Sequence, residues 1–340
     1  MKKITALLSL IAIFMMGAGI AQAEQVYYSS GRYYWDAGNS TDLATAITGA
    51  IGSGNRTVDI WCGGTLYSTI YLQPGLTLKC HNNTFIKGHG GDGFYRDGSG
   101  PYAFYDMTLT RSDKSGMGIR TSRASDATFV NVKITGGSIG IRVDSHPSRP
   151  YEDGRWVYNL YVQDCTFENT GSHGLETYGV DGCGVYGITA NNCGECGVLF
   201  NKTLNASTGT VNAYRCCYGG GYAGLRYANT CGNSTANMLY ADECGRGYFV
   251  LTGSYNITLK NCQITDCSDV GIWLENVTNC SVQSGCCNCG VAVSGSGSYA
   301  NVSSTCGSSS SSSSGITGTK KIINRASGKG MDAGGNSNGS

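Results

Sequence analysis

The sequence has little charge and few histidines. Asp, Glu, Lys and Arg make up 14% of its 340 residues, and 24 basic side chains stand against 23 acidic ones. Nucleic acids and anionic membrane surfaces select proteins with a basic excess, so this balance argues against both as partners. With only four histidines, the chain offers few imidazoles for acid–base or metal chemistry.

Long apolar runs are also scarce, and the one present lies at the N-terminus. It spans Ile4–Ile20, follows two lysines and is followed by Ala21-Gln22-Ala23. A basic start, a short apolar run and a small-x-small site are typical of a secretory signal peptide. We therefore predict a signal peptide at residues 1–23, a mature chain from Glu24 and a secreted protein, extracellular or periplasmic. An uncleaved membrane anchor is the alternative.

Glycine, by contrast, is abundant at 52 residues, while proline is limited to four. Some of the glycines mark a repeat whose units begin GIRTS, GIRVD, GLETY, GVLFN, GLRYA, GYFVL and GIWLE. These units start at Gly118, Gly140, Gly174, Gly197, Gly224, Gly247 and Gly271, with spacings of 22, 34, 23, 27, 23 and 24 residues. Each unit holds short runs of alternating apolar and polar residues separated by Gly, Asn, Ser and Asp, which is typical of strands and turns.

Units of this size cannot bury an apolar face alone, but they form a continuous core when they stack. We therefore predict an all-β protein, a single-stranded right-handed parallel β-helix over residues 24–306. A β-sandwich is the alternative, but it gives no reason for so regular a spacing. Residues 41–51, TDLATAITGAI, have apolar residues at helical spacing behind a capping Thr or Asp. A short helix there would cover the open edge of the first coil.

The cysteines follow the same register. The sequence has 17 of them, an odd number at a level that suits an oxidising compartment. Five fall 18 to 20 residues after the glycine of their unit, namely Cys193, Cys216, Cys244, Cys267 and Cys289. Equivalent positions on neighbouring coils lie about 4.8 Å apart, so we predict a ladder that is partly bridged by disulfides and partly packed as small apolar side chains. The ladder also accounts for CGEC at 193–196 and CCNC at 286–289 without a zinc or redox site.

Alternation along the first strand of each unit places its first and third residues inside and its second and fourth residues outside. The predicted second-position row is Arg120, Arg142, Glu176, Leu199, Arg226, Phe249 and Trp273, and the fourth-position row is Ser122, Asp144, Tyr178, Asn201, Ala228, Leu251 and Glu275. The 34-residue unit carries about eleven extra residues, HPSRPYEDGRW, directly after its strand. Such an insertion leaves the coil as a loop beside these rows, and long loops on a rigid scaffold often carry function.

The coil pattern over roughly residues 36–306 resembles the pectin-lyase-like superfamily of right-handed β-helices, which degrade or bind polysaccharides. The resemblance rests on the repeat and not on a diagnostic motif. The polygalacturonase signatures and the Trp-x-Asp-His of common pectate lyases are missing, and SHG at 172–174 is only a faint echo of one of them. No catalytic residue can therefore be transferred from the family by motif.

Two kinds of cleavage would suit this face. β-Elimination of an acidic, pectin-like plant or algal polysaccharide needs a cation for the sugar carboxylate and a base. Hydrolysis needs two carboxyl groups roughly 5 to 9.5 Å apart, which residues on adjacent coils could supply. The arginine content of the row favours elimination. The predicted catalytic residues are Asp144, His146, His173, Glu176 and Tyr178, and the predicted substrate-binding residues are Arg120, Arg142, Arg149, Arg155, Asn201, Arg226, Trp273 and Asp332.

Binding without cleavage is a third interpretation. The rings of Tyr178, Phe249 and Trp273 would then form a platform for sugars, in a binding or structural protein, and the charges would form a surface cluster of small energetic value. No cofactor is required by either reaction. Ca²⁺ would suit carboxylates such as Glu152 and Asp153, together with Asp144 and Glu176, although no spacing specifies a metal loop. We expect a monomer with a polysaccharide as its partner.

The C-terminal end has a different texture. Ser308–Ser314 is an unbroken serine run, which predicts a flexible linker at residues 307–319. Residues 320–340 contain IINRASGKGMD, which resembles the start of a ricin-type β-trefoil lectin repeat. The resemblance implies a carbohydrate-binding module, with Asp332 at the position that holds a sugar hydroxyl. The chain ends before the repeat does, so this is either a fragment or a degenerate module.

Overall fold

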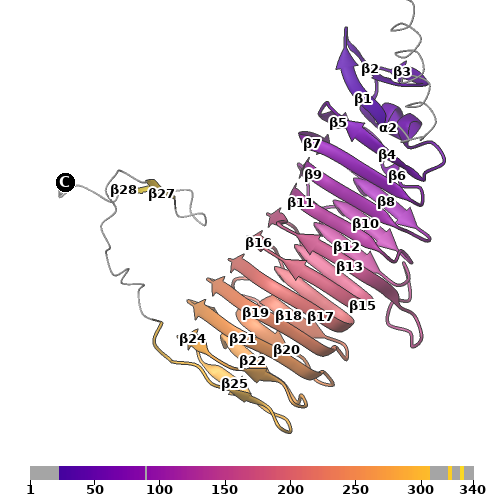
Figure 1. Cartoon of the computed structure of the whole chain (residues 1–340). Coiled ribbons are helices and arrows are strands. Elements are labelled where there is room, and N and C mark those ends of the chain that lie inside the picture. The colour runs from indigo at the N-terminus through magenta and orange to yellow at the C-terminus, as the bar shows by residue number, and fades with distance from the viewer. Residues whose placement is uncertain (1–22, 89, 307–320, 324–329, 333–340) are drawn as a thin grey trace, which may run out of the picture.

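The computed structural model describes residues 23–88, 90–306, 321–323 and 330–332, and it confirms the parallel β-helix. The solenoid has about ten turns, is nearly all-β and contains one short helix (Figure 1). The predicted signal peptide, except for Ala23, and the predicted serine-rich linker lie outside the described residues. No described helix is long and apolar enough to cross a membrane.

Each coil contributes to three rows of parallel strands. The first row contains β1 (Glu24–Ser29), β4 (Arg56–Ile60), β7 (Leu76–Lys87), β9 (Tyr102–Arg111), β11 (Ala127–Thr135), β13 (Val157–Gln163), β15 (Leu175–Tyr186), β17 (Val198–Tyr214), β19 (Gly232–Asp242), β21 (Tyr255–Thr265), β23 (Ser281–Val282) and β26 (Tyr299–Ala300). The second row contains β5 (Gly64–Leu66), β14 (Thr166–Glu168), β16 (Ile188–Asn191), β24 (Gly285–Cys287) and the C-terminal parts of β7, β9, β11, β17, β19 and β21.

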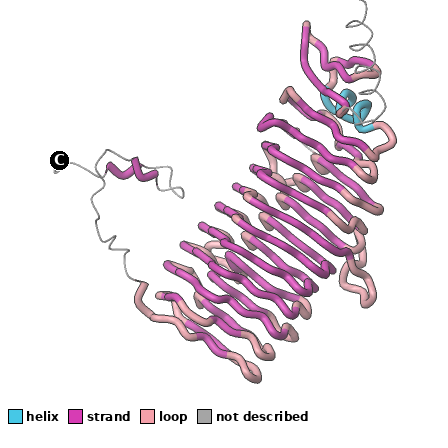
Figure 2. The backbone as a smooth tube through the Cα atoms, viewed as in Figure 1, coloured by secondary structure: helices cyan, strands magenta, loops and turns pink. Residues whose placement is uncertain are grey.

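The third row carries the predicted functional residues. It contains β6 (Ile70–Tyr71), β8 (Phe94–Asp97), β10 (Ile119–Ser122), β12 (Ile141–Asp144), the N-terminal parts of β15 and β17, β18 (Ala223–Ala228), β20 (Arg246–Val250), β22 (Ile272–Leu274) and β25 (Val291–Val293). The strands of this row lie side by side along the whole stack, as the smooth tube in Figure 2 also shows.

The marker glycines have a steric role at the start of the third-row strands. A Cβ atom on Gly140 would lie 2.5 Å from the carbonyl oxygen of Gly174, and one on Gly174 would lie 2.6 Å from that of Gly197. Real Cβ atoms do not approach an oxygen so closely, because the contact is well inside the van der Waals distance. The repeat therefore keeps glycine where one coil packs directly on the backbone of the next.

The N-terminal end is closed as predicted. Helix α2 (Leu43–Ile51) buries its apolar residues against the first coils, and the Asp42 side chain caps it by accepting a hydrogen bond from the Thr45 amide at 2.9 Å. Strands β1, β2 (Arg32–Trp35) and β3 (Gly38–Ser40) form an antiparallel meander beside it. Near the C-terminal end, β27 (Lys321–Ile323) pairs antiparallel with β28 (Gly330–Asp332); the side chain of Asp332 lies outside the described part.

The core differs between the two halves of the stack. In the N-terminal coils the rings of Phe85, Phe94, Phe104 and Phe129 contact one another in sequence, with centroids 5.5 to 6.2 Å apart. In the C-terminal coils the predicted cysteine ladder lies on successive turns, but all five of its members are free thiols. These five are therefore not bridged to one another. The prediction of a partly bridged ladder is confirmed only at CCNC, where Cys286 is joined to Cys306, twenty residues further on.

Candidate functional site

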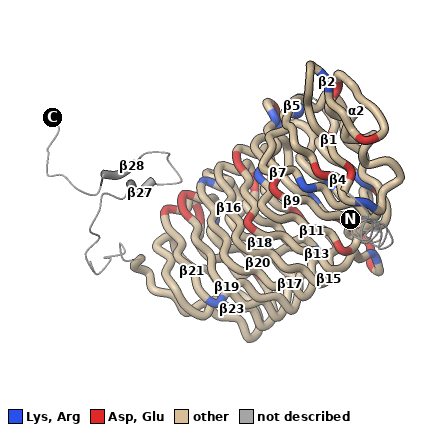
Figure 3. The backbone as a smooth tube through the Cα atoms, turned by 45° about the horizontal axis from the view of Figure 1, so that its top comes forward, with Lys and Arg blue, Asp and Glu red and all other residues tan. Residues whose placement is uncertain are grey.

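The predicted second-position row is confirmed along its whole length. Strand pairing places Arg120 beside Arg142, Arg142 beside Glu176, Glu176 beside Leu199, Leu199 beside Arg226, Arg226 beside Phe249, and Phe249 beside Trp273. Other charged residues are spread over the stack, most of them toward its N-terminal end (Figure 3). The solenoid thus gathers onto one row residues that are far apart in the sequence.

The charged residues at the centre of this row neutralise one another. Arg142 Nε donates to Asp144 Oδ2 at 2.9 Å, and its Nη1 lies 3.0 Å from Glu176 Oε2. Arg120 Nε lies 3.4 Å from the same Asp144 oxygen, and Arg120 Nη2 donates to the Pro147 carbonyl at 2.8 Å. We call Arg120, Arg142, Asp144 and Glu176 the charged cluster. Its formal charges sum to zero, so it offers no free ion to a ligand.

Burial of this cluster corrects the expectation that the outward rows face solvent. Asp144 is fully buried and Glu176 is 4% exposed, while Asn201 is 7% exposed. The arginines lie over the carboxylates, and the start of the insertion contacts Arg120 from above. Side chains that point away from the core are thereby covered by their neighbours. Strand alternation predicts the direction of a side chain, but not what covers it.

Glu176 begins a chain of amides that crosses two further coils. Its Oε1 accepts a hydrogen bond from Asn201 Nδ2 at 3.0 Å, and Asn201 Oδ1 accepts one from Asn229 Nδ2 at 2.8 Å. Burial raises the pKa of Glu176, while the ion pair with Arg142 and the Asn201 amide oppose that shift. Both carboxylate oxygens are therefore engaged.

His173 is held as a neutral imidazole. The Cys196 amide donates to Nδ1 at 3.1 Å, which leaves the proton on Nε2, 3.1 Å from Glu195 Oε2. Burial lowers the pKa of His173 to about 3, and the positive charges of Arg226 and Arg142 act in the same direction. Neither ring nitrogen has a free lone pair, so this residue does not serve as a base in the geometry observed. Glu195, its partner, was not predicted.

The insertion projects from the stack as a loop next to β13 and β15 (Figures 1 and 2). Its arginines are engaged within the loop, because Glu152 pairs with Arg155 at 2.6 Å and with Arg149 at 3.4 Å. His146 Nδ1 accepts hydrogen bonds from the amides of Ser148 and Arg149, both at 3.1 Å. These three predicted residues therefore shape the loop and do not line either pocket described below.

Lys202 lies on the second coil after the one that carries the insertion, and it binds this loop to the stack. Its Nζ donates to the carbonyl oxygens of Pro150 and Arg155, both at 3.4 Å, and to that of Glu152. The ammonium also lies 4.9 Å from the centre of the Trp156 ring. Lys202 is 5% exposed, and burial lowers its pKa. The loop is thus held in place beside the third row.

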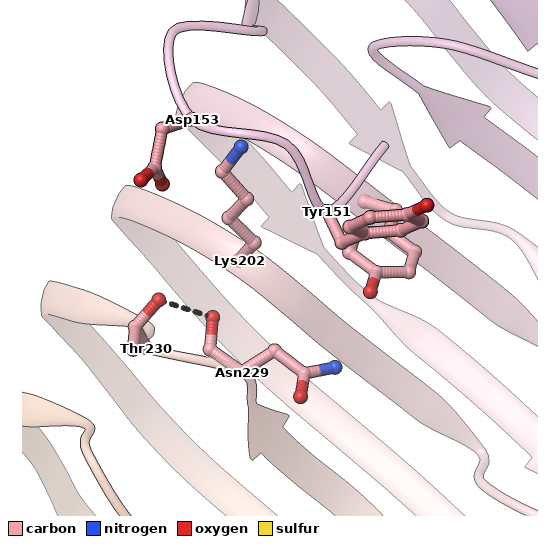
Figure 4. Close-up of a pocket in the computed structure, with 6 residues that line it drawn as sticks. Tyr151, Asp153, Lys202, Asn229 and Thr230 are labelled. Carbon is pink, nitrogen blue, oxygen red and sulfur yellow. Dashed lines mark hydrogen bonds between the residues drawn. The ribbon is translucent and has the colours of Figure 1, made fainter. Parts of the chain in front are cut away.

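A first pocket lies between this loop and the ends of the strands. We call it the tyrosine pocket; its volume is about 250 Å³, and it is lined by Tyr151, Asp153, Tyr178, Lys202, Asn229 and Thr230. Figure 4 shows Tyr151 and Asp153 reaching it from the loop, across from Lys202, Asn229 and Thr230. Asp153 makes no ion pair or hydrogen bond within the described chain. Burial raises the pKa of Tyr178, and the nearby Glu176 carboxylate adds to the shift.

A second pocket of about 220 Å³ adjoins the first, and we call it the arginine pocket. It is lined by His173, Leu199, Asn201, Tyr222, Arg226, Ala228, Asn229 and Leu251, so Asn229 belongs to both pockets. The Arg226 guanidinium lies between two rings, 4.7 Å from the centre of Tyr222 and 4.9 Å from that of Phe249. Among the described residues it pairs with no carboxylate, and its buried Nε has no hydrogen-bond partner.

The neighbouring coil provides a contrast to Arg226. Arg246 also stacks on aromatic rings, 4.9 Å from Phe249 and 4.5 Å from Trp273, but its Nη2 pairs with Asp269 at 2.5 Å. The predicted Trp273 stacks on Phe249 with ring centres 5.0 Å apart. Arg226 therefore differs from Arg120, Arg142 and Arg246 in lacking an anionic partner.

The structure brings together some of the predicted residues and not others. Tyr178, His173, Asn201 and Arg226 line a pocket, whereas Asp144 and Glu176 lie outside the two lining sets. Sequence reasoning did not single out Lys202 or Asn229, and it named Asp153 only as a calcium ligand. Lys202 and Asn229 directly follow the fourth-position residues Asn201 and Ala228. Both have a positive φ, 42° and 54°, so the alternation that places a fifth residue inside does not hold there and could not have found them.

In the described ranges no group of three or more His, Cys, Asp or Glu side chains lies close enough to hold a metal ion. The four carboxylates considered for Ca²⁺ are distributed differently. Asp144 and Glu176 pair with Arg142, Glu152 pairs with Arg149 and Arg155, and Asp153 lies in the tyrosine pocket.

Comparisons with known proteins give a limited result. No protein-family model and no curated protein matches this sequence. Among solved structures, the chain is similar to the enzymatically active domain of tailspike protein 2 of bacteriophage CBA120, at 13% identity and a TM-score of 0.47. The match covers 84% of this chain and 46% of that one, so the chain spans less than half of that structure.

Proposed function

We propose that the protein binds an acidic polysaccharide along the third row and cleaves it by β-elimination. The observation that carries the proposal is Arg226, a guanidinium that lines a pocket without an anionic partner among the described residues. A uronate carboxylate matches a guanidinium in geometry and charge and would supply that partner. Secretion, as predicted from residues 1–23, would bring the protein to such polymers.

Elimination uses a cation of this kind directly. A base removes the hydrogen next to the carboxylate, and the electron pair forms a carbon–carbon double bond. The glycosidic carbon–oxygen bond breaks, and the leaving oxygen takes up a proton. A guanidinium on the carboxylate stabilises the negative charge that develops when the hydrogen departs, most strongly in a site that excludes water. Arg226 has apolar neighbours in Leu199, Ala228 and Leu251, which favours this effect.

Two residues of the tyrosine pocket suit the proton transfers. Tyr178 has a raised pKa and so keeps its proton at neutral pH, as a donor to the leaving oxygen must. Asp153 has no ion pair within the described chain and is the carboxylate of this pocket, so we assign it the role of proton acceptor. Of the remaining predicted groups, His173 has both ring nitrogens occupied.

Hydrolysis by Asp144 and Glu176 receives less support from the geometry. Both carboxylates are paired with Arg142, and Glu176 also accepts the Asn201 amide. A carboxyl group that protonates a leaving group needs contact with the substrate, whereas these two are buried and line neither pocket. Hydrolysis nevertheless makes a different product, so one assay separates the two reactions.

The test is incubation of the mature protein with acidic and neutral polysaccharides. Elimination gives an unsaturated product that absorbs ultraviolet light, hydrolysis gives only new reducing ends, and pure binding gives neither but slows the protein in an affinity gel. We expect ultraviolet absorbance with an acidic polymer, reduced at least a hundredfold in Tyr178→Phe and in Asp153→Asn. Reducing ends without absorbance would contradict the elimination, and unchanged activity in both variants would contradict these assignments.

A further inference from the structure

We propose that the two pockets select different sugars, a neutral one in the tyrosine pocket and an acidic one in the arginine pocket. The ligand that fits both is a polymer that alternates a neutral sugar with a uronic acid. The inference rests on the proposed function, because it assigns the composition of the acidic polysaccharide already assumed to bind this face.

The arginine pocket carries one positive charge. Arg226 is its charged lining residue within the described chain, since His173 is neutral and the other lining residues are uncharged. The guanidinium already has an aromatic ring on each face, so its edge is the part left for a ligand. An edge of two N–H groups binds a carboxylate in bidentate fashion, which favours a uronate here.

The tyrosine pocket has no comparable free cation. The N–H groups of Lys202 are directed at three loop carbonyls, and its positive charge is balanced by Asp153, with which it interacts electrostatically. Asp153 lines the same pocket as Lys202. The two opposite charges leave this pocket with no net charge, so a sugar carboxylate bound here would gain no attraction of the kind that Arg226 offers. A neutral sugar suits such a pocket.

The remaining groups of the tyrosine pocket suit an uncharged sugar. Tyr151 and Tyr178 provide rings, which pack against the apolar face of a pyranose. Asp153 accepts hydrogen bonds from hydroxyl groups, and the Asn229 amide can bond either way. Figure 4 shows these polar groups reaching the pocket from both the loop and the strand ends.

The two pockets are close enough for neighbouring sugars of one chain. Asn229 lines both, and its Nδ2 is bonded to Asn201 Oδ1, which lines the arginine pocket. Both pockets are lined by the same coils, with Tyr178, Lys202 and Thr230 further along the chain of each coil than His173, Leu199 and Arg226. A homopolymer of uronate would place every second carboxylate beside Asp153, and a neutral polymer would leave Arg226 without a partner.

The experiment compares binding to four soluble polymers by affinity electrophoresis at one ionic strength. The probes are polygalacturonate, in which every sugar is acidic; hyaluronan and unsulfated chondroitin, in which acidic and neutral sugars alternate; and dextran, which is neutral. We expect an alternating polymer to bind at least tenfold more tightly than polygalacturonate, and dextran to bind least.

Two variants locate the effect. Asp153→Asn should raise the affinity for polygalacturonate about tenfold, because the charge of Lys202 is then unbalanced, whereas the alternating polymers, whose neutral sugar loses a charged acceptor, should not gain affinity. Arg226→Gln should weaken every acidic polymer at least tenfold. Arg215→Gln is the matched control, since Arg215 also stacks on a tyrosine, 5.1 Å from the Tyr218 ring centre, but pairs with Glu243; it should change nothing.

The outcomes separate the two proposals. Suppose that polygalacturonate binds more tightly than both alternating polymers and that Asp153→Asn does not raise its affinity. This result would overturn the proposed alternation of neutral and acidic sugars, but the proposed acidic ligand would stand. Failure to bind any acidic polymer more tightly than dextran would overturn the proposed function, and the alternation with it. Equal thermal unfolding of variants and wild type excludes misfolding as the cause of a loss.

Discussion

Two stretches of the third row both contain arginine, but the arginines have different neighbours. Along β10, β12 and β15, two arginines and two carboxylates form the charged cluster, in which each ion has a partner. Along β17, β18 and β20, Arg226 lies between aromatic rings with no carboxylate partner in the described chain. The first stretch had the more conspicuous sequence, yet the second has the available charge. A charged side chain that is available to a ligand is therefore recognised by the absence of an oppositely charged partner.

The largest expected effect comes from breaking the charged cluster. In Arg142→Met the buried Asp144 keeps only its longer ion pair, with Arg120, and Glu176 loses its ion pair. Loss of one partner from a buried pair costs about 3–5 kcal/mol. We expect the free energy of unfolding, measured by denaturant titration, to fall by about that amount. A change below about 1 kcal/mol would mean that the cluster does not stabilise the fold.

The second effect concerns the attachment of the loop to the stack by Lys202. Lys202→Met removes the three hydrogen bonds to loop carbonyls while keeping a chain of similar length. We expect a loss of about 2 kcal/mol in stability and faster cleavage of the chain within residues 146–156 in limited proteolysis. Lys260→Met, at an exposed position, is the control. If the two variants are cleaved at the same rate, Lys202 does not hold the loop.

The third effect is a dependence on pH. Because burial lowers the pKa of His173 from 6.5 to about 3, the unfolded chain binds a proton more readily than the folded chain between these values. His173 therefore contributes stability that is present above pH 6.5 and is lost progressively as the pH falls toward 3. The slope is about 1 kcal/mol per pH unit. His173→Gln should flatten the curve of unfolding free energy between pH 6.5 and 5; an identical slope would show that His173 does not titrate in this way.

The smallest effect on stability is expected at Arg226. Arg226→Met removes a cation that pairs with no anion in the described chain and keeps an apolar side chain between Tyr222 and Phe249. We expect the free energy of unfolding to change by less than about 1 kcal/mol, in contrast to Arg142→Met. A loss as large as that of Arg142→Met would mean that the two stretches do not differ in the way described.

The sequence allowed the register of the third row to be predicted residue by residue, because glycines such as Gly140 and Gly174 recur where coils pack on each other's backbone. Burial was not predictable in the same way. Asp144 points away from the core, as strand alternation requires, but the arginines and the insertion cover it. The direction of a side chain is set by its own strand, whereas its burial depends on residues from other coils.

The pockets illustrate the same limit. Tyr178 and Arg226 were predicted from their places in the two rows, and both line a pocket. The partner of His173 is Glu195, on the following coil, and it follows no rule of spacing. The cysteine ladder was predicted in position, but whether two thiols are bonded depends on the direction of their side chains, and the bond that is present uses Cys306.

The most direct test is an isothermal titration of the wild type and Arg226→Gln with one acidic polymer and with the same polymer after chemical reduction of its carboxylates to alcohols. If the guanidinium of Arg226 receives a sugar carboxylate, the wild type will bind the acidic form at least tenfold more tightly, and the variant will bind both forms equally. Retention of the wild-type preference by the folded variant would contradict the account.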